Sequence, residues 1–136
     1  MHGCMAKILL VDDHGMLREL LRGLLEAEQG IKIVGEAEEG RRGLQLAAEH
    51  KPDLVISDLR MKGMGGLEMI REMHAISPRT QVIILSMHGD PSYVTLAMDA
   101  GASGYVLKGS GLQDLLQAIN TVALGQPYVS PSIFKP

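Results

Sequence analysis

Five side chains in the sequence form a set that could transfer a phosphoryl group. Three are the carboxylates of Asp12, Asp13 and Asp58, and the others are the hydroxyl of Ser86 and the ammonium of Lys108. Carboxylates held close together repel one another, so such a group needs a cation to stabilise it. An all-oxygen set without a convergent His or Cys favours Mg²⁺ or Mn²⁺ over zinc. Because Mg²⁺ takes few protein carboxylates and leaves positions open for phosphate oxygens, the set predicts a phosphoryl ligand.

Within this set each residue type has a chemical role. Asp58 is the candidate nucleophile, because a carboxylate can be converted to an aspartyl phosphate. Lys108 would offer a positive charge to a phosphate oxygen, and Ser86 would donate its hydroxyl. Catalysis of this kind consists mostly of charge neutralisation and alignment.

Each of these residues also has an ordinary structural explanation. An aspartate after a strand, such as Asp12 or Asp13, is about as often a helix N-cap or a turn residue. Taken alone, Asp58 is more typical of a turn, Lys108 of a solvated surface and Ser86 of a side chain that satisfies backbone groups. Their joint occurrence at the ends of strands favours the functional interpretation.

Short aliphatic runs and helical patterns alternate along the chain. Five runs bounded by Gly, Pro or Asp predict strands at residues 7–11, 31–35, 54–57, 81–86 and 104–107. Apolar residues at helical spacing predict helices between and after them, with one stripe at Met16, Leu17, Leu20, Leu21, Leu24 and Leu25 and another at Leu112, Leu115, Leu116, Ile119, Val122 and Ala123. Weaker helical patterns lie at residues 40–49, 67–74 and 92–100.

This alternation predicts an α/β fold with a single doubly wound, five-stranded parallel sheet and five helices. Strands that are apolar on both faces and joined by helices are typical of parallel sheets covered on each side. We expect the flavodoxin-like strand order 2-1-3-4-5, in which ligands bind at the carboxyl ends of the strands. The first, third, fourth and fifth strands then lie side by side, so the five polar side chains should converge on one crevice.

Length and composition describe one small domain. The chain has 136 residues, of which 46% are apolar and 21% charged, with a net charge of −3 and one cysteine. A lone cysteine forms no intrachain bridge, so the cytoplasm is the expected location. No apolar run is long enough for a membrane helix, and no secretory signal is recognisable. The slightly acidic balance is a poor footprint for nucleic acid, so we do not expect this segment to bind DNA by itself.

Other candidate sites are weaker. The five histidines show no metal-ligand spacing, and a surface position is expected for most of them. Gly63, Gly65 and Gly66 form neither a dinucleotide-binding nor a Walker motif, and they are interpreted as a tight turn into the third helix.

Several motifs together resemble the receiver domain of two-component response regulators over about residues 5–125. They are Asp12-Asp13 after Ile-Leu-Leu-Val, then Leu-Val-Ile-Ser-Asp58-Leu-Arg-Met, Ile-Ile-Leu-Ser86 and Ala-Gly-Ala-Ser-Gly-Tyr105-Val-Leu-Lys108. Val-Asp-Asp-His14, Gly-Tyr-Val-Leu-Lys and the ending Gly-Gln-Pro-Tyr-Val-Ser-Pro are similar to the LuxR/NarL-type transcription factors within that family.

The resemblance implies a role for each matching residue. Asp58 would take the phosphoryl group from a sensor histidine kinase, and Asp13, Asp58 and the backbone carbonyl of Arg60 would bind Mg²⁺. Asp12 would act on the metal largely through water. The domain would catalyse only its own phosphorylation and dephosphorylation, as a signalling receiver rather than an enzyme.

The resemblance also implies a switch and an output. Ser86 and Tyr105 would form the switch pair: phosphate draws the Ser86 hydroxyl inward, Tyr105 rotates, and the face made by the fourth helix, fifth strand and fifth helix is reshaped. Transcription would be regulated through a helix-turn-helix domain that is not in this sequence, so DNA would be contacted only through that domain. A homodimer formed on phosphorylation is left open, because the stripe at Leu112, Leu115, Leu116 and Ile119 is more typical of core than of interface.

The expected organisation has three parts. Residues 1–4, which precede a second methionine, are interpreted as a cloning remnant, a leader or the product of an alternative start. Residues 5–125 form the receiver domain, and residues 126–136 begin a linker to the output domain. Three alternatives stay open at this point: a natural stand-alone receiver that acts through protein contacts, a receiver-like binding module that is not phosphorylated, and a Mg²⁺-dependent phosphohydrolase with an aspartyl nucleophile.

Overall fold

The computed structural model of the chain describes residues 6–134. The expected cloning remnant or leader, residues 1–4, lies outside the described residues. Within the described range, strands and helices alternate along the chain in the expected order. None of the helices described combines the length and the apolar character that a segment crossing a bilayer requires.

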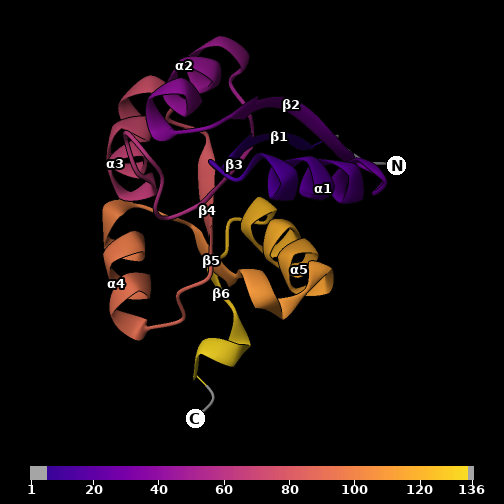
Figure 1. The fold of residues 1–136 in the computed structure, drawn as a ribbon, viewed down its shortest axis with the longest axis vertical. Coiled ribbons are helices and arrows are strands. Elements are labelled where there is room, and N and C mark those ends of the chain that lie inside the picture. Colours follow the sequence, from indigo (N-terminus) through magenta and orange to yellow (C-terminus); the bar gives the residue numbers. More distant parts are fainter. Residues whose placement is uncertain (1–5, 135–136) are drawn as a thin grey trace.

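A single parallel sheet forms the centre of the domain (Figure 1). In the described residues the sheet has six strands in the order β2-β1-β3-β4-β5-β6, which confirms the predicted order of the first five. The strands are β1 (Ala6–Val11), β2 (Ile31–Ala37), β3 (Leu54–Ser57), β4 (Gln81–Ser86), β5 (Gly104–Leu107) and β6 (Tyr128–Val129).

The predicted count of five strands is wrong, because β6 adds a sixth. It pairs in parallel with β5, with Val129 beside Tyr105. A strand of two residues is too short to show alternation, and Pro127 and Pro131 on either side of it suggested a loop. The strand lies within residues 126–136, whose assignment to a linker remains a prediction.

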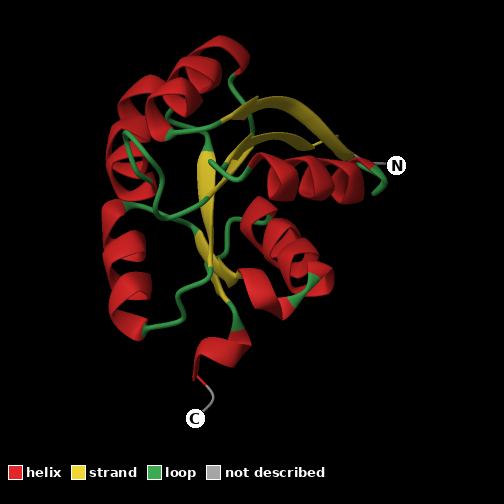
Figure 2. Cartoon of the chain, in the orientation of Figure 1, coloured by secondary structure: helices red, strands yellow, loops and turns green. Residues whose placement is uncertain are grey.

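Five α-helices in the described residues cover the two faces of the sheet. They are α1 (Gly15–Glu26), α2 (Gly40–His50), α3 (Gly66–Ile76), α4 (Pro91–Ala100) and α5 (Leu112–Ala123). Figure 2 shows α2, α3 and α4 on one side of the sheet and α1 and α5 on the other. Successive strand residues point to opposite faces, so Leu9 and Val11 join one buried cluster while Ile8 and Leu10 join the other. This confirms the doubly wound, flavodoxin-like architecture.

The first turn of α2 lies very close to the loop that precedes α3. A Cβ atom added at Gly40 would lie 2.8 Å from the backbone oxygen of Met64 and 3.1 Å from the Cβ atom of Met69. The N–H of Gly40 donates a hydrogen bond of 2.8 Å to that same Met64 oxygen. The loop therefore cannot move away from a larger side chain without losing this bond.

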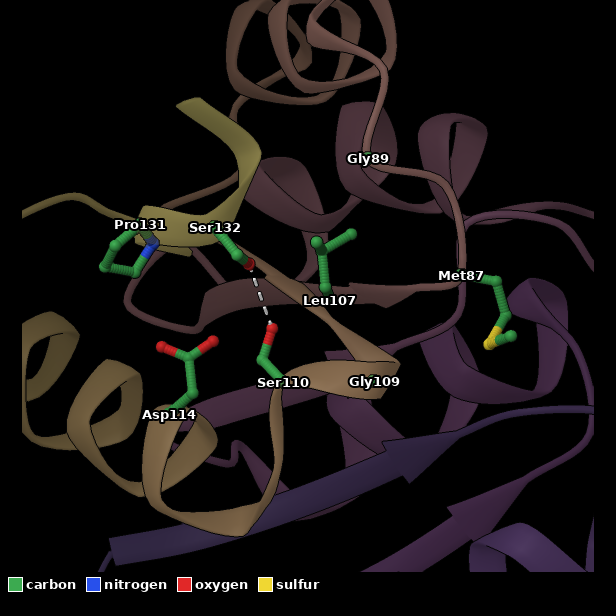
Figure 3. A pocket seen from close by; sticks show the side chains of 8 residues that line it. All are labelled: Met87, Gly89, Leu107, Gly109, Ser110, Asp114, Pro131 and Ser132. Carbon is green, nitrogen blue, oxygen red and sulfur yellow. Dashed lines mark hydrogen bonds between the residues drawn. The ribbon is translucent and has the colours of Figure 1, made fainter. Parts of the chain in front are cut away.

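The C-terminal segment is attached to the sheet by side chains as well as by strand pairing. The hydroxyls of Tyr128 and Ser130 both donate to the carboxylate of Asp114 in the first turn of α5, the latter at 2.5 Å. Figure 3 shows Asp114 beside a pocket of about 540 Å³, where the hydroxyls of Ser110 and Ser132 lie 3.3 Å apart. The residues after α5 are thus part of the folded domain up to the short 3₁₀ helix Pro131–Phe134.

We expect Gly40→Ala to lower the free energy of unfolding by about 1–3 kcal/mol, because the added methyl group overpacks a backbone contact. Gly23→Ala is the matched control, since this glycine lies in the exposed part of α1 and no atom would lie within 4 Å of the new Cβ. The control should raise the free energy of unfolding by about 0.5–1 kcal/mol through helix propensity. Urea denaturation followed by circular dichroism measures both changes, and equal effects would contradict the packing argument.

Burial, together with the hydrogen bond to Asp114, raises the pKa of Tyr128 to about 12. An unfolded chain loses this proton near pH 10, so the stabilisation is fully present below about pH 10 and is lost as the pH rises through the folded-state pKa. We expect the free energy of unfolding to fall between these pH values more steeply in the native protein than in Tyr128→Phe. Denaturant unfolding at a series of pH values tests this, and identical slopes would contradict it.

Candidate functional site

The carboxyl ends of four neighbouring strands meet at one edge of the sheet. The register pairs Val11 with Ser57 and Ser86 with Leu107, so the residues that follow these strands emerge close together. The polar residues at this edge are Asp12 and Asp13 after β1, Asp58 after β3, Ser86 at the end of β4 and Lys108 after β5. The strand order therefore brings together residues that are far apart in the sequence.

Three carboxylates and one imidazole form an acidic cluster at this edge. One oxygen from each of Asp12, Asp13 and Asp58 and one ring nitrogen of His14 all lie within 4.8 Å of one another. The side chains of Asp12 and Asp58 are 11% and 9% exposed, so the cluster is only partly open to water. We use the name acidic cluster for these four residues.

Lys108 provides a positive charge inside the acidic cluster. Its Nζ atom lies 3.1 Å from Oδ2 of Asp12 and 3.2 Å from Oδ2 of Asp58, and its side chain is 8% exposed. Three carboxylates and one ammonium leave a formal charge of −2 before the imidazole is counted. Since uncompensated charges in a partly buried site are unfavourable, a divalent cation would complete the neutralisation.

Asp13 supplies the observation that fits a metal ion. Its Oδ1 atom is shielded from solvent and accepts no hydrogen bond, although Nδ1 of His14 lies 3.3 Å away. Its other oxygen accepts a long hydrogen bond of 3.3 Å from the backbone N–H of Lys62. A buried carboxylate oxygen without a donor is available to a hard cation such as Mg²⁺. The acidic cluster could therefore bind a divalent metal.

The backbone around Asp58 fixes the direction of its carboxylate. The N–H of Asp58 donates to the Val11 carbonyl at 2.9 Å, and the N–H of Leu59 donates to its Oδ1 atom at 2.8 Å. A Cβ atom at Gly66 would lie 2.5 Å from the carbonyl oxygen of Asp58, so only glycine permits α3 to begin so close to the acceptor loop. One carboxylate oxygen thus meets a backbone donor and the other meets Lys108.

Ser86 and Tyr105 are joined through the loop that follows β4. The Ser86 hydroxyl is buried and accepts a hydrogen bond of 3.0 Å from the N–H of His88. The Tyr105 side chain is fully buried, and its hydroxyl donates to the His88 carbonyl at 2.6 Å. Burial raises the pKa of the Tyr105 hydroxyl, so it remains a protonated donor. Both side chains therefore form hydrogen bonds with the backbone of the same residue, His88.

The side chain of Arg60 points to a different partner. Its guanidinium donates to the hydroxyl of Tyr93 in α4 and lies 5.1 Å from the centre of that ring. The ring of His88 is 5.1 Å from the same tyrosine ring, so Tyr93 connects the loops that follow β3 and β4. The metal-binding role expected for the Arg60 carbonyl stays a prediction.

His14 is the residue that sequence reasoning missed. A surface position was expected for most of the histidines. The His14 side chain is 67% exposed, but its Nδ1 atom points into the acidic cluster at 3.0 Å from Asp12. The sequence motifs for metal-binding histidines require further histidines or cysteines at fixed spacing. His14 instead lies beside aspartates that follow two different strands. Its position directly after Asp12-Asp13 was the available signal.

A second unanticipated contact supports the loop after β1. The guanidinium of Arg18 donates to the Asp12 carbonyl, while its Nε atom pairs with Glu36 at 3.0 Å. Burial opposes ionisation of Glu36, but hydrogen bonds from Arg22 and Arg18 hold the pKa of that carboxyl below its usual value. The predicted strand order already places β2 beside β1. It does not say which side chains of α1 and β2 meet, so this network was not predicted.

Comparison with known proteins gives concordant matches. The family described as the response regulator receiver domain matches residues 8–120. The response regulators GacA of Pseudomonas aeruginosa and UvrY of Escherichia coli are 41% and 37% identical to the chain, each over 95% of its length. The transcriptional regulatory protein DegU of Brevibacillus brevis is 34% identical over 93% of the chain.

Solved structures agree with the sequence matches. A two-component response regulator of the LuxR family from Aurantimonas sp. SI85-9A1 superposes with a TM-score of 0.91 at 38% identity, covering 95% of this chain and 92% of that one. The signal receiver domain of NarL from Mycobacterium tuberculosis superposes with a TM-score of 0.86 at 31% identity, covering 91% and 100% of the two chains.

The family match extends from β1 into α5 and so includes every strand that contributes to the acidic cluster. The chain spans 60% of the length of GacA, 59% of UvrY and 54% of DegU. It belongs to the response regulator receiver domains, and within them to the LuxR/NarL type.

Proposed function

We propose that this domain accepts a phosphoryl group on Asp58 from a sensor histidine kinase, with Mg²⁺ bound beside it, and thereby switches a surface that regulates transcription. The observation that carries the proposal is the contact of 3.2 Å between Lys108 Nζ and Asp58 Oδ2 within the acidic cluster. Membership of the receiver family supports the same reaction class.

In the proposed reaction a carboxylate oxygen of Asp58 attacks the phosphorus atom of a phosphohistidine. The new P–O bond forms as the P–N bond breaks, and the imidazole leaves with the electron pair of that bond. Lys108 neutralises charge on a phosphoryl oxygen, and the N–H of Leu59 keeps the carboxylate oriented. The protein's contribution is charge placement and alignment rather than proton transfer.

We assign the metal to residues that already carry the oxygen atoms it needs. Asp13 and Asp58 would bind Mg²⁺ through their carboxylates and Arg60 through its backbone carbonyl, while Asp12 would act through water. The unpartnered Oδ1 atom of Asp13 supports this assignment. When bound, Mg²⁺ supplies positive charge to the phosphoryl oxygens.

The proposed switch uses the hydrogen bonds that meet at His88. In the described structure Ser86 and Tyr105 both bind the backbone of that residue. When the Ser86 hydroxyl turns toward a phosphoryl group, it releases the His88 N–H and the loop moves. Tyr105 then follows its acceptor, which changes the surface formed by α4, β5 and α5.

The proposed output is regulation of transcription from the cytoplasm. The name of DegU, a transcriptional regulatory protein, supports this output, and the greater length of the relatives supports a DNA-binding domain outside this chain. DNA would be contacted through that domain, with homodimer formation following phosphorylation.

Incubation with Mg²⁺ and acetyl phosphate should add one phosphoryl group to the domain, measured by intact-protein mass spectrometry. Asp58→Asn should abolish the addition, because the amide oxygen is a far weaker nucleophile than the carboxylate. Asp99→Asn, the same change at an exposed residue of α4, is the matched control and should label like the native protein. Labelling that survives Asp58→Asn would move the acceptor to another residue.

Multiple turnover of free phosphate esters, without accumulation of labelled protein, would favour a phosphohydrolase instead. Stoichiometric labelling that decays slowly supports the receiver function. The two measurements distinguish the functions, because a receiver releases phosphate only from its own acyl phosphate and does not turn over free esters.

Asp13→Ala should weaken Mg²⁺ binding by at least about tenfold, because removing even an outer-shell partner commonly lowers metal affinity by about 10–100-fold. Isothermal titration calorimetry with Mg²⁺ measures the change, and Asp99→Ala serves as the control for loss of one surface charge. Unchanged affinity in Asp13→Ala would remove the metal from this site and favour a module that signals without phosphorylation.

A further inference from the structure

The imidazole of His14 occupies a position that a metal ligand would take. Its Nδ1 atom lies 3.0 Å from an oxygen of Asp12, 3.3 Å from Oδ1 of Asp13 and 3.8 Å from Oδ2 of Asp58. Ligands bound about 2.1 Å from an octahedral ion are about 3.0 Å apart when adjacent and about 4.2 Å apart when opposite. The three measured separations fall within that range.

The local backbone holds the ring in this position. The N–H of His14 donates to Oδ1 of Asp12 at 2.8 Å, and Nδ1 approaches the same oxygen. The chain then enters α1 at the next residue. The backbone N–H and the ring of His14 thus both lie against Asp12, and Nδ1 faces the acidic cluster. In the tautomer that carries its proton on Nε2, Nδ1 has a free lone pair for a metal ion.

An imidazole nitrogen changes which ions the site prefers. Mg²⁺ favours oxygen ligands and retains its water molecules, whereas imidazole suits Ni²⁺, Cu²⁺, Zn²⁺ and iron. For a mixed nitrogen and oxygen site, affinity rises from Mn²⁺ through Co²⁺ to Ni²⁺. The carboxylates alone give little of this selectivity, so His14 is the group that would confer it.

We propose that His14 is a direct ligand, through Nδ1, for first-row transition ions that enter the acidic cluster, and that it makes this cluster prefer Ni²⁺ and Co²⁺ to Mg²⁺. The inference rests on the proposed metal site, and it adds a nitrogen ligand to a set otherwise made of oxygen atoms. Its consequence is that a transition ion competes with Mg²⁺ at the position beside Asp58.

The test uses Mn²⁺ as a paramagnetic probe and compares His14→Ala and His14→Phe with the native ring. All proteins carry His2→Ala and Cys4→Ser, because an imidazole and a thiol near the amino terminus would bind the same ions. Pulsed electron paramagnetic resonance should show coupling of bound Mn²⁺ to a directly bonded ¹⁴N nucleus. The coupling should vanish in both His14 variants and persist in His50→Ala, an exposed histidine of α2.

Calorimetry with Ni²⁺ and Mg²⁺ gives an independent measure. The His14 variants should bind Ni²⁺ at least about tenfold more weakly, by comparison with the losses seen for outer-shell partners, while Mg²⁺ affinity changes far less. His14→Phe keeps a planar ring without a nitrogen, so it separates ligation from simple filling of space. Circular dichroism of each variant establishes that it is folded before the titration.

Two failures are distinguishable. If the protein with the native His14 binds neither Mg²⁺ nor Mn²⁺, the proposed metal site itself is wrong. If it binds Mg²⁺ normally but shows no ¹⁴N coupling, or if Ni²⁺ affinity is the same with and without His14, then the role of His14 is wrong and the proposed function stands.

Discussion

Mutual repulsion among Asp12, Asp13 and Asp58 is the constraint on which the rest of the site depends. The strand order brings these carboxylates to one sheet edge, and Lys108 offsets only part of their charge. In the proposed function, the remaining negative charge would attract a divalent cation and, with it, an anionic phosphoryl group. The energy of a site with this excess of negative charge would also change when a phosphoryl group binds. Under the proposed function, this excess of negative charge would both favour reaction at Asp58 and give that reaction a structural effect.

In the proposed switch, this effect would pass through a small number of hydrogen bonds. Ser86 accepts from the N–H of His88, Tyr105 donates to the carbonyl of the same residue, and the Tyr105 side chain is fully buried. A close-packed interior shifts between discrete arrangements rather than deforming gradually. In the proposed switch, a small displacement of His88 would therefore move the buried Tyr105 ring. Glycine at position 66 contributes to the same rigidity, because it lets α3 start in contact with the Asp58 carbonyl.

Much of this could be predicted from the sequence, and the exceptions have physical reasons. The strands followed from the aliphatic runs, the strand order is one of the common choices for a doubly wound sheet, and the polar residues at the strand ends located the aspartates. In contrast, β6 was missed because two residues carry no periodicity, and its attachment depends on Asp114, which is remote in sequence. Burial along α1 was also misjudged: Leu25 is fully buried, whereas Met16 is 86% exposed although it lies in the same apolar stripe. His14 was missed because its role arises from two strands meeting, not from the spacing of like ligands.

The sixth strand affects how readily another chain could pair with the edge of the sheet. Open sheet edges are templates on which other chains can pair, and long parallel sheets form slowly enough to expose them. Here β6 covers the hydrogen-bonding edge of β5 with only two residues. Pro127 directly precedes this strand, and Pro131 follows it after one residue. Because proline cannot donate to a ladder, the new edge offers almost nothing for another strand to extend. The segment thus limits the pairing of another strand at this edge of the sheet.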